Sequence, residues 1–89
     1  MSPFASGFPM TSTLHDPDYR VFVSHLVALR QEQGITQATL AARLGRPQSF
    51  ISKSERFERR IDPAEFRQIA VALGCDPVEQ FAAVVRKLA

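Results

Sequence analysis

The 89-residue sequence predicts an all-α domain, and three observations support this conclusion. Apolar residues recur at the three- and four-residue spacing of helices, whereas the apolar–polar alternation of strands is missing. Asp-Pro occurs at three places, and this pair suits a helix start because aspartate caps free N–H groups and proline fits the first turn. Glycines follow where periodic stretches end. We expect one domain of five helices, at about residues 17–33, 37–44, 48–56, 63–73 and 77–88.

Residues 1–15 precede these helices and contain no Asp, Glu, Lys or Arg. Their prolines and the absence of a periodic pattern predict an N-terminal arm with little regular structure. Phe4 and Phe8 are candidates for docking on the folded domain. DNA contact by the arm is disfavoured because arms that read the minor groove use Arg or Lys. The segment also lacks the basic region and long apolar stretch of a secretory signal.

The first predicted helix begins at Asp16-Pro17 and carries more apolar surface than one stripe. We expect the arm, the last helix or a second chain to cover the excess. The apolar side chains are Phe22, Val23, Leu26, Val27 and Leu29.

Residues 36–56 are the most informative part of the chain, because they form two short helical patterns joined by a tight break. Thr36 suits the N-cap of the first, and Gly45 can take the left-handed conformation that ends it. Pro47 suits the first turn of the second. Ile51 is the buried residue of that helix, and its opposite face is polar. A short exposed helix with amides, hydroxyls and one cation suits the major groove of DNA; the side chains are Gln48, Ser49, Ser52 and Lys53.

The last two helices begin at Asp62-Pro63 and Asp76-Pro77. A glutamate three residues after each Asp, Glu65 and Glu79, gives the spacing of a capping box. The fourth helix repeats apolar residues at helical spacing until Gly74 stops it: Phe66, Ile69, Ala70 and Leu73. The fifth helix does the same with Val78, Phe81, Ala82, Val85 and Leu88.

The positive charge is concentrated on and after the proposed DNA-reading helix. Residues 46–60 hold five basic and two acidic side chains, a balance of +3, whereas the whole chain has a net charge of only +2. A run of this kind is either an ordinary solvated helix end or a surface that meets phosphates. Beside the two-helix pattern of residues 36–56, we favour phosphates.

Together these motifs resemble the helix-turn-helix of the lambda-repressor-like family, also called the XRE family, from about Leu26 to about Pro77. The resemblance implies a five-helix DNA-binding domain over residues 16–89, with the helix-turn-helix at about 36–56. The matching pieces are Arg30, Gly34-Ile35-Thr36-Gln37, Leu40-Ala41, Leu44-Gly45, Gln48–Lys53, Glu55-Arg56, Glu58-Arg59-Arg60, Asp62-Pro63 and Ala72-Leu73-Gly74.

The resemblance also implies roles for single residues. Gln48, Ser49, Ser52 and Lys53 are expected to contact bases, and Gln37 is expected to bind a phosphate or to brace Gln48. Arg30 and Glu55 match a structural ion pair between the first helix and the DNA-reading helix. Phe50 has two open interpretations, contact with DNA or packing on the neighbouring helix. The expected phosphate contacts are Gln37, Arg43, Phe50, Arg56, Arg59 and Arg60.

Three positions depart from the family pattern. Phe57 stands where glycine usually ends the DNA-reading helix, so either the helix continues or the loop differs, since a left-handed backbone is strained for Phe. Ser54 replaces the usual Ile or Leu, which weakens the core. Pro47 replaces a Ser or Thr cap.

Family members usually bind pseudo-palindromic operators as two-fold dimers. Here the last helix is the expected dimer surface, with intramolecular packing as the alternative; we expect its apolar stripe to be divided between the two. The residues are Val78, Phe81, Val85 and Leu88.

The resulting prediction is a sequence-specific transcriptional regulator, with repression as the expected effect, in the cytoplasm of a bacterium or phage. Open alternatives are an antitoxin with a toxin partner, a restriction-modification controller, and a protein-interaction adaptor that does not bind DNA. Catalysis, a metal site and a cofactor are not expected, because His15 and His25 have no acidic cluster beside them and no phosphate-binding glycine loop is present. No apolar run is long enough to span a membrane.

Overall fold

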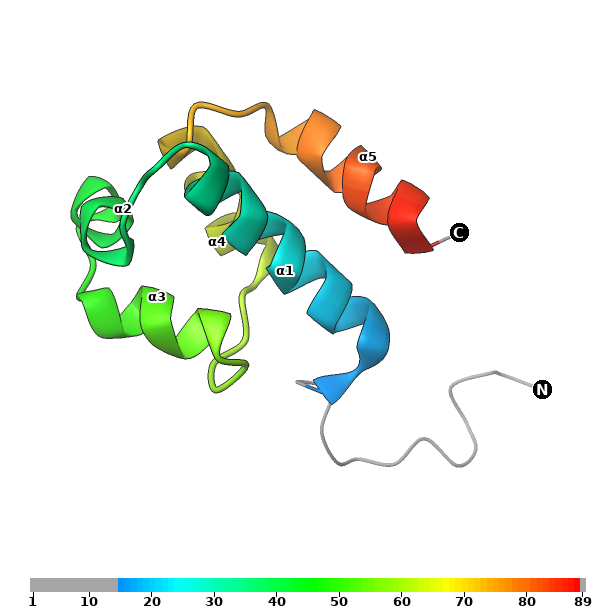
Figure 1. Ribbon diagram of the computed structural model, residues 1–89, viewed down its shortest axis with the longest axis horizontal. Helices are drawn as coiled ribbons and strands as arrows, with labels where there is room; N and C mark the ends of the chain where they lie inside the picture. Colours follow the sequence, from blue (N-terminus) through cyan, green and yellow to red (C-terminus); the bar gives the residue numbers. More distant parts are fainter. Residues whose placement is uncertain (1–14, 89) are drawn as a thin grey trace.

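The computed structural model describes residues 15–88, which form five α-helices (Figure 1). The prediction of an all-α fold is confirmed, and the three helix ends that differ from prediction do so by one residue. The expectations about the arm, including docking of Phe4 and Phe8, fall on residues 1–14, outside the described residues. The helices are α1 (Pro17–Glu32), α2 (Gln37–Leu44), α3 (Gln48–Glu55), α4 (Pro63–Ala72) and α5 (Pro77–Leu88).

The expected caps fix where the helices begin. The Asp16 carboxylate accepts hydrogen bonds from the backbone N–H groups of Asp18 and Tyr19, at 2.8 and 3.2 Å. Asp62 and Glu65 form the complete capping box that their spacing predicts. Pro47 differs slightly from its prediction, because it occupies the N-cap of α3 rather than the first turn, and its side chain makes no capping hydrogen bond.

Two left-handed residues turn the chain after α2 and α3. Gly45 ends α2 at φ 65°, as predicted. Phe57 adopts φ 62°, so the helix does not continue through it, although this conformation costs a non-glycine residue about 1–2 kcal/mol. The Phe57 ring packs against the core, and the Arg20 guanidinium lies over it at 4.6 Å. These contacts offset the strain, and the family-like turn is kept without glycine.

The core lies where α1 meets the other helices, with α2 and α3 on one side of α1 and α5 on the other (Figure 1). Ser54, expected to weaken it, is buried with 2% of its surface exposed, and its hydroxyl donates to the Phe50 carbonyl at 2.6 Å. Its burial therefore leaves no unpaired polar group. The buried apolar residues of the core, from the helices and the segments beside α4, are Val23, Leu26, Leu40, Ala41, Phe50, Ile51, Ile61, Phe66, Ile69, Ala70, Leu73 and Val84.

The apolar stripe of α5 points away from the core. Val84, which was not in the predicted stripe, is its buried residue. Of the expected stripe, Phe81 packs on an inner ring, that of Phe66, although Val78, Phe81, Val85 and Leu88 are 76, 53, 47 and 39% exposed; the interface part of the expected division stays a prediction. No single helix in residues 15–88 is long and apolar enough to cross a membrane; α4 and α5 pass that test only as a pair bent by 113°.

A buried histidine joins α1 to α5. His25 is 9% exposed, and its ring nitrogens lie 2.8 Å from Lys87 Nζ and 2.7 Å from Gln80 Oε1. An ammonium group can only donate, so Nδ1 accepts from Lys87 and the Nε2–H group donates to Gln80. This pair of hydrogen bonds sets the position of α5 along α1.

Candidate nucleic-acid interface

One face of α3 is polar and open to solvent, as the sequence predicts. Ile51 is 2% exposed and anchors the opposite face in the core. Among the described residues, the Lys53 ammonium has no hydrogen-bond or ion-pair partner, so it is available to an acceptor outside the chain. Gln48, Ser49 and Lys53 are exposed and Ser52 is half-buried.

The orientation of α3 is set by a buried ion pair, which confirms the expected pairing. Arg30 Nε lies 2.7 Å from Glu55 Oε2, and Arg30 Nη2 donates to Glu55 Oε1 at 2.9 Å. The two side chains are only 11 and 15% exposed. Arg30 Nη1 also donates to the Ile35 carbonyl at 2.8 Å. The guanidinium thus connects the end of α1, the loop before α2 and the end of α3.

Two glutamines extend this pair toward the open face of α3. Gln37, the first residue of α2, donates from Nε2 to Glu55 Oε1 at 2.8 Å. Gln48, the first residue of α3, donates from Nε2 to Gln37 Oε1 at 3.5 Å. The bracing role expected for Gln37 is therefore present in the structure. Gln48 is exposed, and this hydrogen bond uses only one of its N–H groups, so its amide oxygen and second N–H are left to pair with adenine.

A second buried carboxylate, Glu65, holds the loop that follows α3. Arg59 donates to both Glu65 oxygens, at 3.0 and 2.8 Å, and Arg46 lies 3.3 Å from Oε2. The hydrogen bonds from Arg59 lower the pKa of Glu65 to about 2, against the opposing effect of burial; the backbone N–H of Asp62 and the charge of Arg46 add to the lowering. The carboxylate therefore stays charged at neutral pH and fixes two guanidiniums.

Phe50 belongs to the core, which corrects its expected contact with DNA. It is 7% exposed, and the guanidiniums of Arg46 and Arg59 lie 4.2 and 4.6 Å from the centre of its ring. The packing interpretation is the one that the structure supports. Glu65 gathers both arginines against this ring, so Phe50, Glu65 and the two arginines form one cluster between α2, α3 and α4.

The other expected phosphate contacts lie in different surroundings. Arg43 donates to the Ala72 carbonyl at the end of α4, at 2.9 Å. Arg56 is 57% exposed and pairs with Glu58 at 2.9 Å, and the hydrogen bond from Arg56 lowers the pKa of Glu58. Arg60 is exposed, with its guanidinium 4.7 Å from the centre of the Tyr19 ring. Arg43, Arg56 and Arg60 are thus exposed, whereas Arg59 is half-buried and held by Glu65.

Sequence reasoning missed three features that position this surface. Glu65 was assigned only to a capping box, and Arg46 was not singled out beyond its charge. The link from His25 to α5 was missed as well. Their partners come from other helices or from across an irregular loop, and no local pattern marks them. The one available signal was the buried position of Glu65, which follows from its place beside Phe66 and Ile69 on α4.

Comparison with known proteins agrees with the geometry. The helix-turn-helix family model matches residues 26–80. An XRE-family like protein from Pseudomonas syringae pv. tomato str. DC3000 is 42% identical, with a TM-score of 0.80; the match covers 89% of this chain and 96% of that protein. The structure of a hypothetical transcription factor from Neisseria is similar in fold, with a TM-score of 0.63 at 23% identity, over 84% of this chain and 82% of that one. The comparison with curated proteins gives no match.

The matched residues include α2, α3 and the turn between them, together with the ion pair and the polar face described above. More than half of the chain therefore follows the family pattern, and a relative of nearly the same length shares over two fifths of its residues. The departures at Phe57, Ser54 and Pro47 leave the arrangement of α2 and α3 intact. The chain belongs to the XRE family of helix-turn-helix DNA-binding regulators.

Proposed function

We propose that this protein recognises a specific DNA sequence through α3 and acts as a dimeric repressor. The observation that carries the proposal is the outward polar face of α3, held rigidly by the buried pair of Arg30 and Glu55. A rigid helix is needed because side chains must meet base edges in a fixed register. Repression requires only that the bound protein blocks access to the same DNA.

Each side chain of this face has a suited partner in the major groove. Gln48, braced by Gln37, is matched to the N6 and N7 atoms of adenine. Lys53 can donate to O6 and N7 of guanine, and Ser49 and Ser52 can donate or accept. Phosphate contacts are assigned to Arg56 and Arg60, with the N-terminus of α2 at Gln37 as a third. These contacts position the helix and do not select sequence.

Dimer formation is proposed through α5. One such domain makes few base contacts, and two copies on a two-fold operator double them. The stripe of Val78, Phe81, Val85 and Leu88 is exposed in the single chain, which supports its use against a second copy. Helix α5 meets the domain through Val84, through the Phe81 ring and through the hydrogen bonds of His25, whereas the exposed side chains of Val78 and Val85 are available to a second copy.

Selection of bound duplexes from a randomised DNA pool, at about 0.15 M salt, tests the proposal directly. We expect a two-fold motif with half-sites about 10 base pairs apart. Enrichment of a single half-site would contradict the proposed dimer but would still support sequence-specific DNA binding. No enrichment by folded protein would contradict specific binding, and would favour an adaptor or an antitoxin that needs its toxin to bind DNA.

Replacing Lys53 with alanine should relax base preference at one position of each half-site. The loss of a good base contact corresponds to about 1–3 kcal/mol of discrimination. The measurement is a comparison of affinities for the selected operator and for operators with single substitutions. Lys53 is exposed and unpaired within residues 15–88, so the fold should not change.

Arg56→Ala is the matched control for Lys53→Ala, because Arg56 is exposed but assigned to phosphate. We expect binding to weaken evenly on all operators, with the slope of log affinity against log salt reduced by about one. If both variants change base preference in the same way, or neither changes binding, the assignment of α3 to the groove is wrong.

Val85→Asp should convert the proposed dimer to a monomer. Val85 is 47% exposed, so the charge costs little in the single chain but would be buried in a dimer interface. Sedimentation at several concentrations measures the association. The control Val71→Asp changes a valine of similar exposure, 53%, on α4 and should leave association unchanged. Equal association of both variants and the parent would exclude α5 as the interface.

A further inference from the structure

Helix α3 ends in a turn whose backbone would suit glycine, and Phe57 occupies it. The Phe57 N–H donates to the Ser54 carbonyl at 3.2 Å, and the Glu58 N–H donates to the Lys53 carbonyl at 2.8 Å, which is the pattern of a Schellman motif. Both hydrogen bonds use backbone atoms, and glycine would make them without the strain of φ 62°. The turn therefore does not need the phenyl side chain, and the contacts of the ring indicate what it does.

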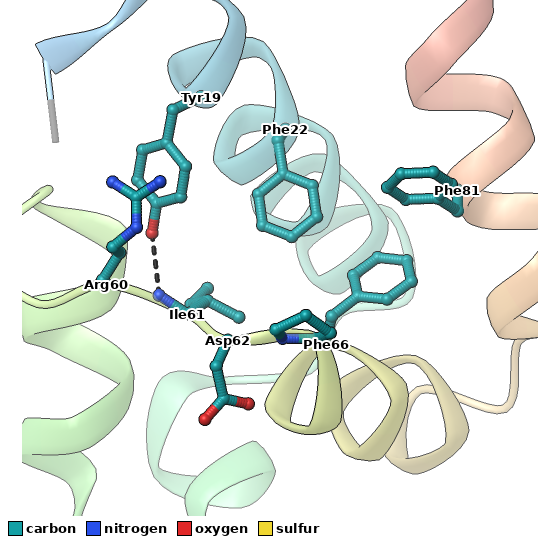
Figure 2. A pocket seen from close by; sticks show the side chains of 8 residues that line it. Tyr19, Phe22, Arg60, Ile61, Asp62, Phe66 and Phe81 are labelled. Atoms are coloured by element: carbon teal, nitrogen blue, oxygen red, sulfur yellow. Dashed lines mark hydrogen bonds between the residues drawn. The ribbon is translucent and has the colours of Figure 1, made fainter. Parts of the chain in front are cut away.

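The Phe57 ring carries the guanidinium of Arg20, from the first turn of α1, at 4.6 Å from its centre. Beside it a second contact runs in the opposite direction, from the loop to α1. The Arg60 guanidinium lies 4.7 Å from the centre of the Tyr19 ring, and Tyr19 Oη accepts from the Ile61 N–H at 2.8 Å (Figure 2). The first turn of α1 and the loop after α3 are thus joined at two adjoining points.

The N–H groups of Arg20 are not used by these contacts. A guanidinium that stacks on a ring uses its flat face, and its donors point outward in the plane. Arg20 is exposed and makes no hydrogen bond or ion pair within residues 15–88. The Asp16 carboxylate, one turn earlier, accepts from the backbone N–H groups of Asp18 and Tyr19 instead. Arg20 is therefore a positioned cation with open donors, and this arrangement suits a phosphate.

We propose that Arg20, held on the Phe57 ring, binds a phosphate of the DNA backbone beside the end of α3. The inference rests on the proposed function, which assigns Arg56 and Arg60 to phosphates. Phe57 directly follows Arg56 in the chain, and Arg60 lies on the ring of the residue before Arg20, so the three guanidiniums belong to one edge of the domain. The strained phenylalanine is then a positioning residue, because it fixes a guanidinium without using its donors.

Arg20→Ala should weaken binding to the operator recovered from the randomised pool several-fold at about 0.15 M salt, and should lower the slope of log affinity against log salt by about one. The matched control is Arg67→Ala, because Arg67 is also exposed and unpaired within residues 15–88 but lies on α4. The control removes the same charge and should keep the slope of the parent. An unchanged slope in Arg20→Ala would overturn the proposal, and so would an equal change in both variants, because net charge alone would then explain it.

Substitutions of Phe57 test the positioning role. Phe57→Leu keeps an apolar side chain but removes the aromatic face, whereas Phe57→Tyr keeps the ring. We expect the Leu variant to bind several-fold more weakly and the Tyr variant to bind as the parent does, with circular dichroism showing that each is folded. In an Arg20→Ala background, Phe57→Leu should cause no further loss. A further loss of the same size would show that the ring acts independently of Arg20.

The outcomes also distinguish this proposal from the proposed function. If the parent binds duplexes without sequence preference, the proposed function is wrong, and the salt slopes on one random duplex still decide the role of Arg20, because non-specific binding also depends on phosphates. If the parent prefers its operator and Arg20→Ala keeps the slope, only the Arg20 contact is wrong. A folded parent that binds no duplex would overturn both.

Discussion

Arg30→Ala is expected to lower the free energy of unfolding by about 3–5 kcal/mol, because it leaves the buried Glu55 carboxylate without its cation. The two side chains are 11 and 15% exposed and share two hydrogen bonds, so solvent cannot replace the lost partner well. Arg30 also serves the Ile35 carbonyl, which loses its donor in the variant. The measurement is urea unfolding at pH 7, with the change expected in the midpoint and not in the slope.

The chain offers a matched control in Arg56→Ala, which removes another arginine paired with a glutamate. The Arg56 and Glu58 side chains are 57 and 53% exposed, so water solvates Glu58 when Arg56 is removed. We expect no measurable change in stability from this variant. If Arg30→Ala lowers the free energy of unfolding as little as Arg56→Ala does, burial does not make the Arg30–Glu55 pair more stabilising than the exposed pair.

The same substitution separates stability from DNA recognition. In Arg30→Ala, Gln37 keeps one hydrogen bond to a carboxylate that is no longer fixed, so Gln48 loses its brace.

The double variant Arg30→Met with Glu55→Met removes both charges and is expected to recover much of the stability, since apolar pairs of similar size replace buried ion pairs well. It should not recover specific binding, because Gln37 then has no carboxylate to orient it.

The helix bounds and the polar face of α3 were predictable because their signals are local. Caps such as Asp62 with Glu65, and Gly45 at its left-handed position, act within a few residues. The period of α3 fixes which side chains share a face with Ile51 and which oppose it. The pairing of Arg30 with Glu55 depended on the family resemblance, since 25 residues separate the two and no local pattern connects them.

The buried side of α5 could not be read from its sequence, because the helical period marks one apolar stripe but does not show which edge of that stripe packs on the domain. Val84 is buried while Val85 and Val78 are exposed, and only packing against α1 decides between them. The burial of His25 could not be predicted from the sequence for a related reason. Its partners Gln80 and Lys87 are 55 and 62 residues away, so the environment of the ring depends on the position of α5.

Glu65 should make stability depend on pH in the acid range. Its pKa is about 2 in the folded protein, against an ordinary value of 4.5, and the hydrogen bonds from Arg59 are the main cause. Because the folded pKa is the lower one, the stabilisation is fully present above about pH 5. As pH falls toward 2, the unfolded chain takes up the proton first and the stabilisation is lost. The shift corresponds to roughly 3 kcal/mol as an order of magnitude.

Glu65→Gln tests this argument because glutamine keeps the size of the side chain and can still accept at the cap, but cannot ionise. The variant should be less stable than the parent at pH 7 and should lose less stability between pH 5 and pH 2, as measured by urea unfolding at several pH values. Glu58→Gln removes an exposed carboxylate and should follow the parent. A Glu65→Gln curve parallel to that of the parent would show that another carboxylate carries the acid dependence. If the free energies of unfolding of Glu65→Gln and of the parent approach each other as the pH falls, Glu65 is the charge that holds Arg46, Arg59 and Phe50 together.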